Sequence, residues 1–440
     1  MYRIICLLLA LMMVIPACAE EKYSEFPKAL RMTQKRVKNE ITNASYIMTH
    51  YPRTNVKAVD AALEEALDAL TEENRPYLPL KSSIVSESAM IDTCPTVYRT
   101  GTKWTSFLMI SSVMEGGKQL RMNFDTRVYD METGAQLTLN DVLLPSGLPF
   151  VQEEAKKQLA ALFPQYETDE EKLAALCAEE SILSSCFTVS PAFLQLHFDS
   201  SALYDHEGAI MHVRIPHTQL TEYLTEEAKV QTDNSKYKLA ALTYDDGPTR
   251  RRTLNIIRSL RTGGQNATFF VVGERMANAT DMILLEHNAG FTVASHNYYH
   301  VYTGDMAGKV QSYRDIFNEE LCALTGSPLT MMRAPGGQEQ IYIDENVGLP
   351  LIHWSLASKD GKSDNFDVKE EAKRIAYSLQ DGTIVLMHDL RAITAEYTSF
   401  LPLLLNERGF MCVTVDELFA LRGIPLEPNT VYMNAPPQAQ

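Results

Sequence analysis

The two halves of the sequence carry different hydrophobic patterns, and together they predict an α/β protein. From residue 238 to residue 424, short apolar strands alternate with helical stretches, which is typical of a parallel sheet or barrel. From residue 46 to residue 227, longer alternating strands and amphipathic helices indicate a smaller α+β domain. The polar residues 228–237 separate the two patterns and are the expected linker. With 440 residues, the chain is long enough for both hydrophobic cores.

The first 19 residues have the pattern of a secretory signal peptide. Arg3 precedes an apolar run over residues 4–15, and the small residues 17–19 supply a cleavage site. The run is shorter than the ~20 residues of a membrane span, so we expect a secreted or cell-surface protein. An uncleaved N-terminal anchor and a lipid attached to Cys18 are the alternatives.

The charge balance argues against a nucleic-acid partner, because the net charge is −16 and no basic patch offsets it. Beyond the signal, the cysteines are odd in number and lack the spacing of a zinc cluster. Cys177 and Cys186 are close enough in sequence to form a disulfide, and buried free thiols are the alternative. We expect a charged lead-in over residues 20–45 and a disordered tail over residues 425–440.

Within the first region, apolar residues recur at three- and four-residue spacing from Val56 to Leu70, which predicts an amphipathic helix. Further strands are expected over residues 104–113, 120–129, 193–198 and 209–215, and further helices over 151–162 and 170–178. In the second region, strands are expected over residues 239–244, 266–272, 291–295 and 383–387, and helices from about residue 250 and over 276–286.

Two adjacent carboxylates, Asp245 and Asp246, follow the first strand of the second region. Neighbouring carboxylates are costly to bury unless a metal, an arginine or a shared proton compensates them. Functional residues of β/α folds gather at the carboxyl ends of strands, where this pair lies. The pair therefore predicts a site, although Asp-Asp-Gly-Pro taken alone is also an ordinary turn.

Two histidines four residues apart, His296 and His300, follow the expected strand over residues 291–295. Both imidazoles can reach one metal ion, and with Asp246 they would form a set that leaves positions open for water and substrate. Taken alone, a pair of surface or capping histidines would look the same.

Three further segments place polar side chains near the predicted strand ends. Arg333 can orient a carboxylate, and the following glycines let backbone N–H groups approach a ligand. Trp354 shares a segment with Asp360, and His388 ends the strand over residues 383–387, where a histidine can act as a general acid. Each feature alone also fits a surface arginine, a core tryptophan or a half-buried histidine.

The order of these motifs is more specific than any one of them. Asp-Asp, His-x-x-x-His, Arg-x-Pro-x-Gly, Trp…Asp and Leu-x-His, taken in sequence, resemble the polysaccharide deacetylase family, the NodB-like carbohydrate esterases. The likeness covers roughly residues 238–423, and the segments 266–273 and 409–415 are similar to the second and last strands of that family. The resemblance implies a distorted (β/α) barrel over residues 238–424.

The resemblance also implies roles for individual residues. The ligands of one divalent metal ion, usually zinc with cobalt or manganese as alternatives, would be Asp246, His296 and His300. The groups of the reaction would be Asp245 as base, Arg333 to orient it, His388 as general acid and Asp360 as its partner. The acetyl pocket would be lined by Trp354 and Leu386, and the oxyanion would face the backbone N–H of Gly336.

Together these features predict a secreted, metal-dependent hydrolase that removes N-acetyl groups from cell-wall amino sugars, with peptidoglycan as the expected substrate. Ala334, Ala357 and Gly361 depart from common family residues, so the resemblance does not carry specificity over. The alternatives are a deacetylase of chitin, xylan or an exopolysaccharide, and an inactive wall- or lysozyme-binding protein.

The first region is faintly similar to the region that precedes the barrel in some bacterial peptidoglycan deacetylases, and to part of the lysozyme-sensing anti-sigma factors. It would bind wall or a protein ligand, and a folded spacer without a ligand is the alternative.

Overall fold

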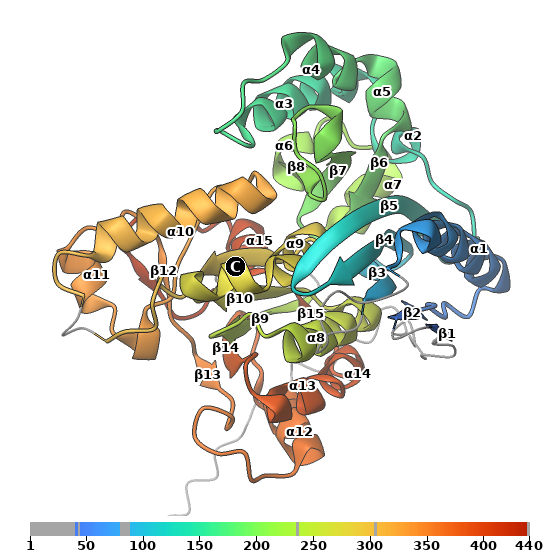
Figure 1. Ribbon diagram of the computed structural model, residues 1–440. Helices are drawn as coiled ribbons and strands as arrows, with labels where there is room; N and C mark the ends of the chain where they lie inside the picture. Colours follow the sequence, from blue (N-terminus) through green and yellow to red (C-terminus); the bar gives the residue numbers. More distant parts are fainter. Residues whose placement is uncertain (1–39, 43–44, 80–88, 235–236, 303–305, 438–440) are drawn as a thin grey trace, which may run out of the picture.

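The computed structural model describes residues 40–42, 45–79, 89–234, 237–302 and 306–437. The expected signal peptide and most of the charged lead-in lie outside these residues. Within the described chain, no helix has the length and apolar character that crossing a bilayer requires. An N-terminal α+β region and a β/α barrel lie side by side (Figure 1).

A five-stranded sheet forms the first layer of the N-terminal region. In spatial order its strands are β1 (Glu40–Thr42), β2 (Ser45–Thr49), β3 (Met90–Thr100), β4 (Trp104–Glu115) and β5 (Lys118–Asp130). Helix α1 (Lys57–Asn74) packs Leu63 and Leu67 against one face of this sheet, as the spacing of its apolar residues predicts. Strand β4 is buried on both faces, because Phe107 faces α1 while Leu108 packs on the other side, with Ile210.

The second layer is an antiparallel sheet covered by short helices. Its strands are β6 (Cys186–Val189), β7 (Phe193–Asp199) and β8 (Ile210–Pro216). The helices of this region are α2 (Leu139–Val142), α3 (Leu148–Ala161), α4 (Glu170–Leu176), α5 (Glu179–Ser184), α6 (His217–Leu220) and α7 (Glu226–Thr232). Cys177 and Cys186 are both free thiols, so the structure shows the alternative to a disulfide.

Two polar segments are more ordered than their composition suggests. Residues 228–232 of the expected linker lie in α7, where Thr225 caps the helix and the side chain of Gln231 is buried. The prediction of a disordered tail is wrong for residues 425–437. There β16 (Val431–Tyr432) pairs in parallel with β12 (Leu351–Ile352), and Ala435 is fully buried. Backbone pairing and burial of one alanine are not visible in a segment rich in Pro, Asn and Gln.

The second region is built on parallel strands. The main sheet has the order β11 (Thr292–Ser295), β10 (Ala267–Val271), β9 (Lys238–Asp245), β14 (Thr383–His388) and β13 (Leu356–Ala357), and β15 (Phe410–Cys412) pairs with the start of β9. Single parallel bridges continue from Ser295 through Met332 to Leu351 in β12. Because β12 and β13 belong to one short segment, the strands curl round to meet. The predicted distorted barrel is therefore confirmed.

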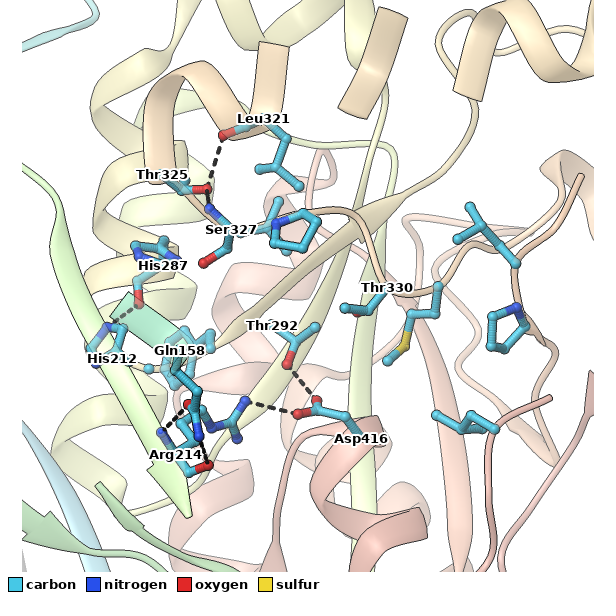
Figure 2. A pocket seen from close by; sticks show the side chains of 18 of the residues that line it. Gln158, His212, Arg214, His287, Thr292, Leu321, Thr325, Ser327, Thr330 and Asp416 are labelled. Carbon is cyan, nitrogen blue, oxygen red and sulfur yellow. Dashed lines mark hydrogen bonds and ion pairs between the residues drawn. The ribbon is translucent and has the colours of Figure 1, made fainter. Parts of the chain in front are cut away.

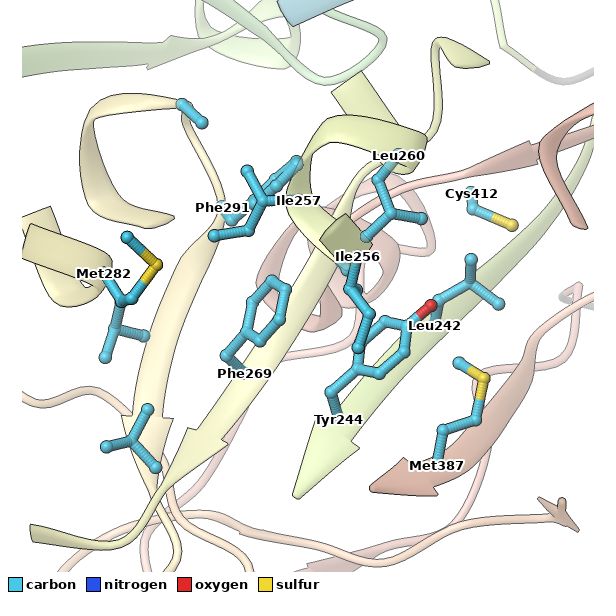
Figure 3. Close-up of a cluster of buried hydrophobic side chains, with 14 of the residues drawn as sticks. Leu242, Tyr244, Ile256, Ile257, Leu260, Phe269, Met282, Phe291, Met387 and Cys412 are labelled. Atoms are coloured by element: carbon cyan, nitrogen blue, oxygen red, sulfur yellow. The ribbon is translucent and has the colours of Figure 1, made fainter. Parts of the chain in front are cut away.

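Helices cover the outside of the barrel. They are α8 (Arg250–Gly263), α9 (Thr280–Asn288), α10 (Val310–Thr325), α11 (Gln340–Asp344), α12 (Val368–Ser378), α13 (Ala392–Thr398), α14 (Leu401–Glu407) and α15 (Val415–Leu421). Tyr244 and Phe269 stack at a centroid distance of 5.2 Å beneath Ile256 and Ile257 of α8 (Figure 3). Each such buried aliphatic side chain stabilises the fold by roughly 1.5–3 kcal/mol. This packing holds β9 in place, and with it Asp245 and the following Asp246 at the end of the strand.

Polar contacts join the two regions. Arg258 of α8 forms a buried ion pair with Asp92 of β3 at 2.6 Å, and Arg261 Nε donates to Thr96 Oγ1 at 2.9 Å. At the amino end of the barrel, a cavity of about 630 Å³ separates β8 from the barrel. His212 and Arg214 line one side of it, and Asp416 lies opposite, paired with Arg214 (Figure 2).

Candidate active site

The candidate site lies where β9, β11 and β14 end. The strand register pairs Asp245 with Phe270 of β10 and with His388 of β14, so the carboxyl ends of these strands lie together. Asp246 follows with a φ of 77°, in the left-handed region, so its carboxylate departs from the alternation of the strand. His296 directly follows β11. The turn after β9 and the loop after β11 therefore meet at one edge.

Asp246, His296 and His300 form a compact group, with one ligand atom from each lying within 4.8 Å of the others. Asp246 Oδ1 is 3.4 Å from His296 Nε2 and 3.3 Å from His300 Nε2. The Nδ1 atom of His296 lies 3.0 Å from the backbone oxygen of Arg333, which orients Nε2 toward the carboxylate.

The donor set of this group fits a divalent metal ion. Asp246 Oδ1 is buried and has no hydrogen-bond partner within the described part of the chain. Such an atom is costly unless a cation or a donor satisfies it. Two imidazole nitrogens and one carboxylate oxygen are typical ligands of zinc in a site that keeps positions open.

Asp245 pairs with a buried arginine instead. Arg333 Nη1 donates to Asp245 Oδ1 at 2.7 Å, while Asp245 Oδ2 lies 3.8 Å from His296 Nε2. The Arg333 side chain is fully buried, and its other donors bind Thr243 Oγ1 and the backbone oxygens of Ile352 and His353. The ion pair compensates the cost of burying both charges and fixes one carboxylate oxygen. The other oxygen faces Asp246, His296 and His300, which we call the metal-type group.

His388 and Asp360 form the second polar pair of the site. His388 Nδ1 lies 2.9 Å from Asp360 Oδ1, and the backbone N–H of His388 donates to Asp360 Oδ2 at 2.9 Å. Burial raises the pKa of Asp360, but the hydrogen bond and charge of His388 outweigh it and lower that pKa to about 2. Burial lowers the pKa of His388, and Asp360 reverses this effect, so the net pKa of His388 is raised. The imidazole is thus suited to carry a proton.

The expected pocket residues lie around these pairs. Trp354 stacks on His353 at a centroid distance of 3.9 Å, and the Arg333 guanidinium lies 5.7 Å from the Trp354 ring. Leu386 is buried on β14 beside Thr243, two residues before His388. Gly336 is less directly connected, because no described contact joins it to Asp246, His296 or His300.

Asp389, which the sequence reading did not single out, lies at the same edge. Burial raises its pKa to about 7, and Thr253 Oγ1 donates to its Oδ2 at 2.7 Å. A Cβ atom at Gly247 would overlap this carboxyl group, so only glycine fits there. The position directly after His388 was the available signal, but a buried carboxyl cannot be told from an exposed turn residue in sequence.

Residues 232–348 match the family model described as polysaccharide deacetylase. The peptidoglycan-N-acetylglucosamine deacetylase PgdA of Listeria monocytogenes is 32% identical over 188 residues, which cover 41% of this chain and 39% of that protein. The peptidoglycan-N-acetylmuramic acid deacetylase PdaC of Bacillus subtilis is 26% identical over 195 residues, which cover 43% and 40%.

A solved acetyl xylan esterase from Clostridium thermocellum, in complex with a cobalt ion, is 27% identical with a TM-score of 0.43. That match covers 45% of this chain and 100% of the esterase.

The parallel barrel brings two histidines and the carboxylates of Asp245 and Asp246 together at the carboxyl ends of its strands, with a donor set that fits a divalent metal ion. The family model and both relatives match the part of the chain whose motifs resemble the polysaccharide deacetylase family. The match spans about two fifths of the length of PgdA and PdaC, and the N-terminal region is additional to it.

Proposed function

We propose that this protein is a secreted, metal-dependent deacetylase that hydrolyses N-acetyl groups of cell-wall amino sugars, with peptidoglycan as its substrate. The observation that carries the proposal is the Asp246, His296 and His300 group, flanked by the pairs Asp245–Arg333 and His388–Asp360. The names of PgdA and PdaC favour peptidoglycan.

Asp246, His296 and His300 would hold the metal ion, with zinc as the expected metal and cobalt or manganese as alternatives. When bound, such an ion lowers the pKa of water and polarises a carbonyl oxygen.

The two oxygens of Asp245 have separate tasks in this proposal. Oδ1 is held by Arg333, so Oδ2 is the atom that accepts a proton from the attacking water. Because Arg333 is buried and hydrogen-bonded to Thr243, Ile352 and His353, it would hold the base in one orientation.

His388 gives a proton to the leaving amine. Its Nδ1–H is donated to Asp360, which leaves Nε2 to carry the transferred proton. The backbone N–H of Gly336 would face the oxyanion, and Trp354 with Leu386 would line the acetyl pocket. Loss of one such oxyanion contact typically costs ~3–4 kcal/mol of transition-state stabilisation.

The test is acetate release from purified peptidoglycan and from chitin oligomers by three samples. These are the wild type, the wild type with its metal removed by a chelator, and Asp245→Asn. We expect release by the untreated wild type alone, restored to the chelated sample by zinc. Equal background acetate from all three samples on both substrates would overturn the proposal and favour an inactive binding protein.

Secretion and the role of the N-terminal region belong to the same proposal. Mass spectrometry of the protein from the culture medium should find a mature chain that begins after Ala19; a chain that keeps residues 1–19, or a lipid on Cys18, would contradict cleavage. The N-terminal region is proposed to bind wall or a protein ligand, which sedimentation of the full chain with purified peptidoglycan would test.

A further inference from the structure

Two tyrosines of the loop after β11 lie over glycines. Tyr298 packs on Gly273, and Tyr302 packs on Gly336, where an added Cβ atom would lie 2.9 Å from the ring atom Cε1. Gly336 also has a φ of 65°, which favours glycine. The absence of a side chain at both glycines therefore makes room for the two rings.

The two rings differ in what the fold uses them for. Tyr298 is partly buried, and its hydroxyl donates to Glu320 at 2.7 Å. Tyr302 is 54% exposed, and its hydroxyl has no hydrogen-bond partner among the described residues. Tyr298 thus anchors the loop, whereas Tyr302 is held against a glycine while one face and its hydroxyl remain open to a ligand.

The Tyr302 ring lies directly beside the metal-type group. It meets the ring of His300 edge to face, with a centroid distance of 5.6 Å and an interplanar angle of 85°. The His300 side chain is itself 32% exposed, so the site opens to solvent on the side where Tyr302 stands. A sugar whose acetyl group reaches Asp246, His296 and His300 would pass this ring.

We propose that Tyr302 is a sugar-binding platform, on which the pyranose ring next to the acetyl group stacks. This inference rests on the proposed function. A tyrosine offers an apolar face to the C–H groups of a sugar and a hydroxyl to its polar groups. Contacts with His300 and Gly336 hold the ring before substrate arrives, so little conformational freedom is lost on binding.

The test compares Tyr302→Ala and Tyr302→Phe with the control Tyr377→Ala. Tyr377 is 63% exposed on α12, away from the site, so its loss should change nothing. For Tyr302→Ala we expect a rise in KM of roughly 3- to 10-fold for the tetramer of N-acetylglucosamine, the size of one aromatic contact, with kcat nearly unchanged. Tyr302→Phe should fall between that variant and the wild type.

Two further measurements separate binding from support of the metal ligand. The kcat/KM for p-nitrophenyl acetate, which has no sugar, and the zinc content of Tyr302→Ala should equal those of the wild type. An unchanged KM for the tetramer, or a loss of zinc and of esterase activity together, would overturn the platform.

Calorimetric titration with the same tetramer distinguishes this inference from the proposed function. If the wild type binds the tetramer but releases no acetate, and Tyr302→Ala binds more weakly, the deacetylase function fails while the platform stands. If both proteins bind the tetramer equally, or neither binds it, the platform fails.

Discussion

Two clusters of histidines lie in this protein, and their surroundings are opposite. At the carboxyl end of the barrel, His296 and His300 face the carboxylate of Asp246. Between the two regions, His197, His212 and His287 contact no carboxylate within the described residues, and His212 and His287 line the cavity of Figure 2.

The second cluster is a chain of neutral rings. His197 Nδ1 lies 2.8 Å from His212 Nδ1, and His212 Nε2 lies 3.1 Å from the backbone oxygen of His287. Burial lowers the pKa of His197 to about 3 and that of His287 to about 4. In contrast, the adjacent Asp246 raises the pKa of His300. Burial still lowers the pKa of His296, although Asp245 and Asp246 oppose the effect. The two clusters therefore differ in whether a carboxylate lies within reach of the imidazoles, which is what a shared cation requires.

The largest expected effect on activity comes from replacing a histidine of the first cluster, with a histidine of the second cluster as the control. The His296→Ala variant should no longer bind the metal ion. Its rate of deacetylation should fall by about 10³-fold or more, because several kcal/mol of transition-state stabilisation are lost. His212→Ala should keep metal and activity but lower the free energy of unfolding by roughly 1–3 kcal/mol, since His197 Nδ1 loses its partner. Acetate release, metal content and urea unfolding measure both variants. Metal loss in His212→Ala would break the comparison.

A second contrast uses the two carboxyl groups at the same edge, Asp245 and Asp389. Asp245→Asn should reduce kcat by roughly 10²–10⁴-fold while the metal stays bound, as expected when a general base is removed. Asp389→Asn is the matched control. Burial raises the pKa of the Asp389 carboxyl group to about 7, and the amide oxygen of asparagine can still accept the hydrogen bond from Thr253. Similar losses of kcat in both variants would show that Asp245 has no special role.

The pH profile tests the partner of His388. In the proposed mechanism His388 must be protonated to donate, and Asp360 raises its pKa, so we expect the alkaline limb of kcat/KM to lie above the ordinary histidine value. Asp360→Asn removes that charge, the pKa of His388 falls, and the limb should move to lower pH by roughly one unit. An alkaline limb at the same pH in Asp360→Asn would mean that a group other than His388 titrates there.

The smallest effect is on stability. The folded pKa of His197 is depressed, so its contribution is fully present above the unfolded value of about 6.5 and is lost as pH falls toward the folded value. At pH 5 the loss for one such histidine should be about 2 kcal/mol relative to pH 7. His197→Gln should flatten the dependence of unfolding free energy on pH between 7 and 5. An unchanged slope would mean that His197 is not buried as a neutral ring.

The sequence predicted which polar residues lie together at the strand ends better than it predicted the connections between regions. Asp245, Asp246, His296 and His300 each lie beside a short apolar strand, so strand ends and four-residue spacing were enough to bring them together. The assignment of base and ligand within the Asp-Asp pair came from the family resemblance and stays a prediction; the structure shows that Arg333 binds Asp245.

What sequence could not predict depends on contacts between distant residues. His197 and His212 lie on neighbouring strands of one sheet and meet His287 of α9 from the barrel, and no periodicity links such positions. The pairing of β16 with β12 and the contact of Tyr302 with Gly336 are of the same kind. Polar composition was misleading for the tail because backbone pairing, not side-chain burial, orders most of it.

The attachment of α8 to the N-terminal sheet limits how far the barrel can be separated from the rest of the chain. Arg258 and Arg261 are neutralised or hydrogen-bonded by β3, and Met90 and Met114 of that sheet belong to the same apolar core as the barrel strands. A truncated protein that begins at the barrel would expose this apolar surface to water and favour aggregation. We therefore expect the two regions to fold as one unit.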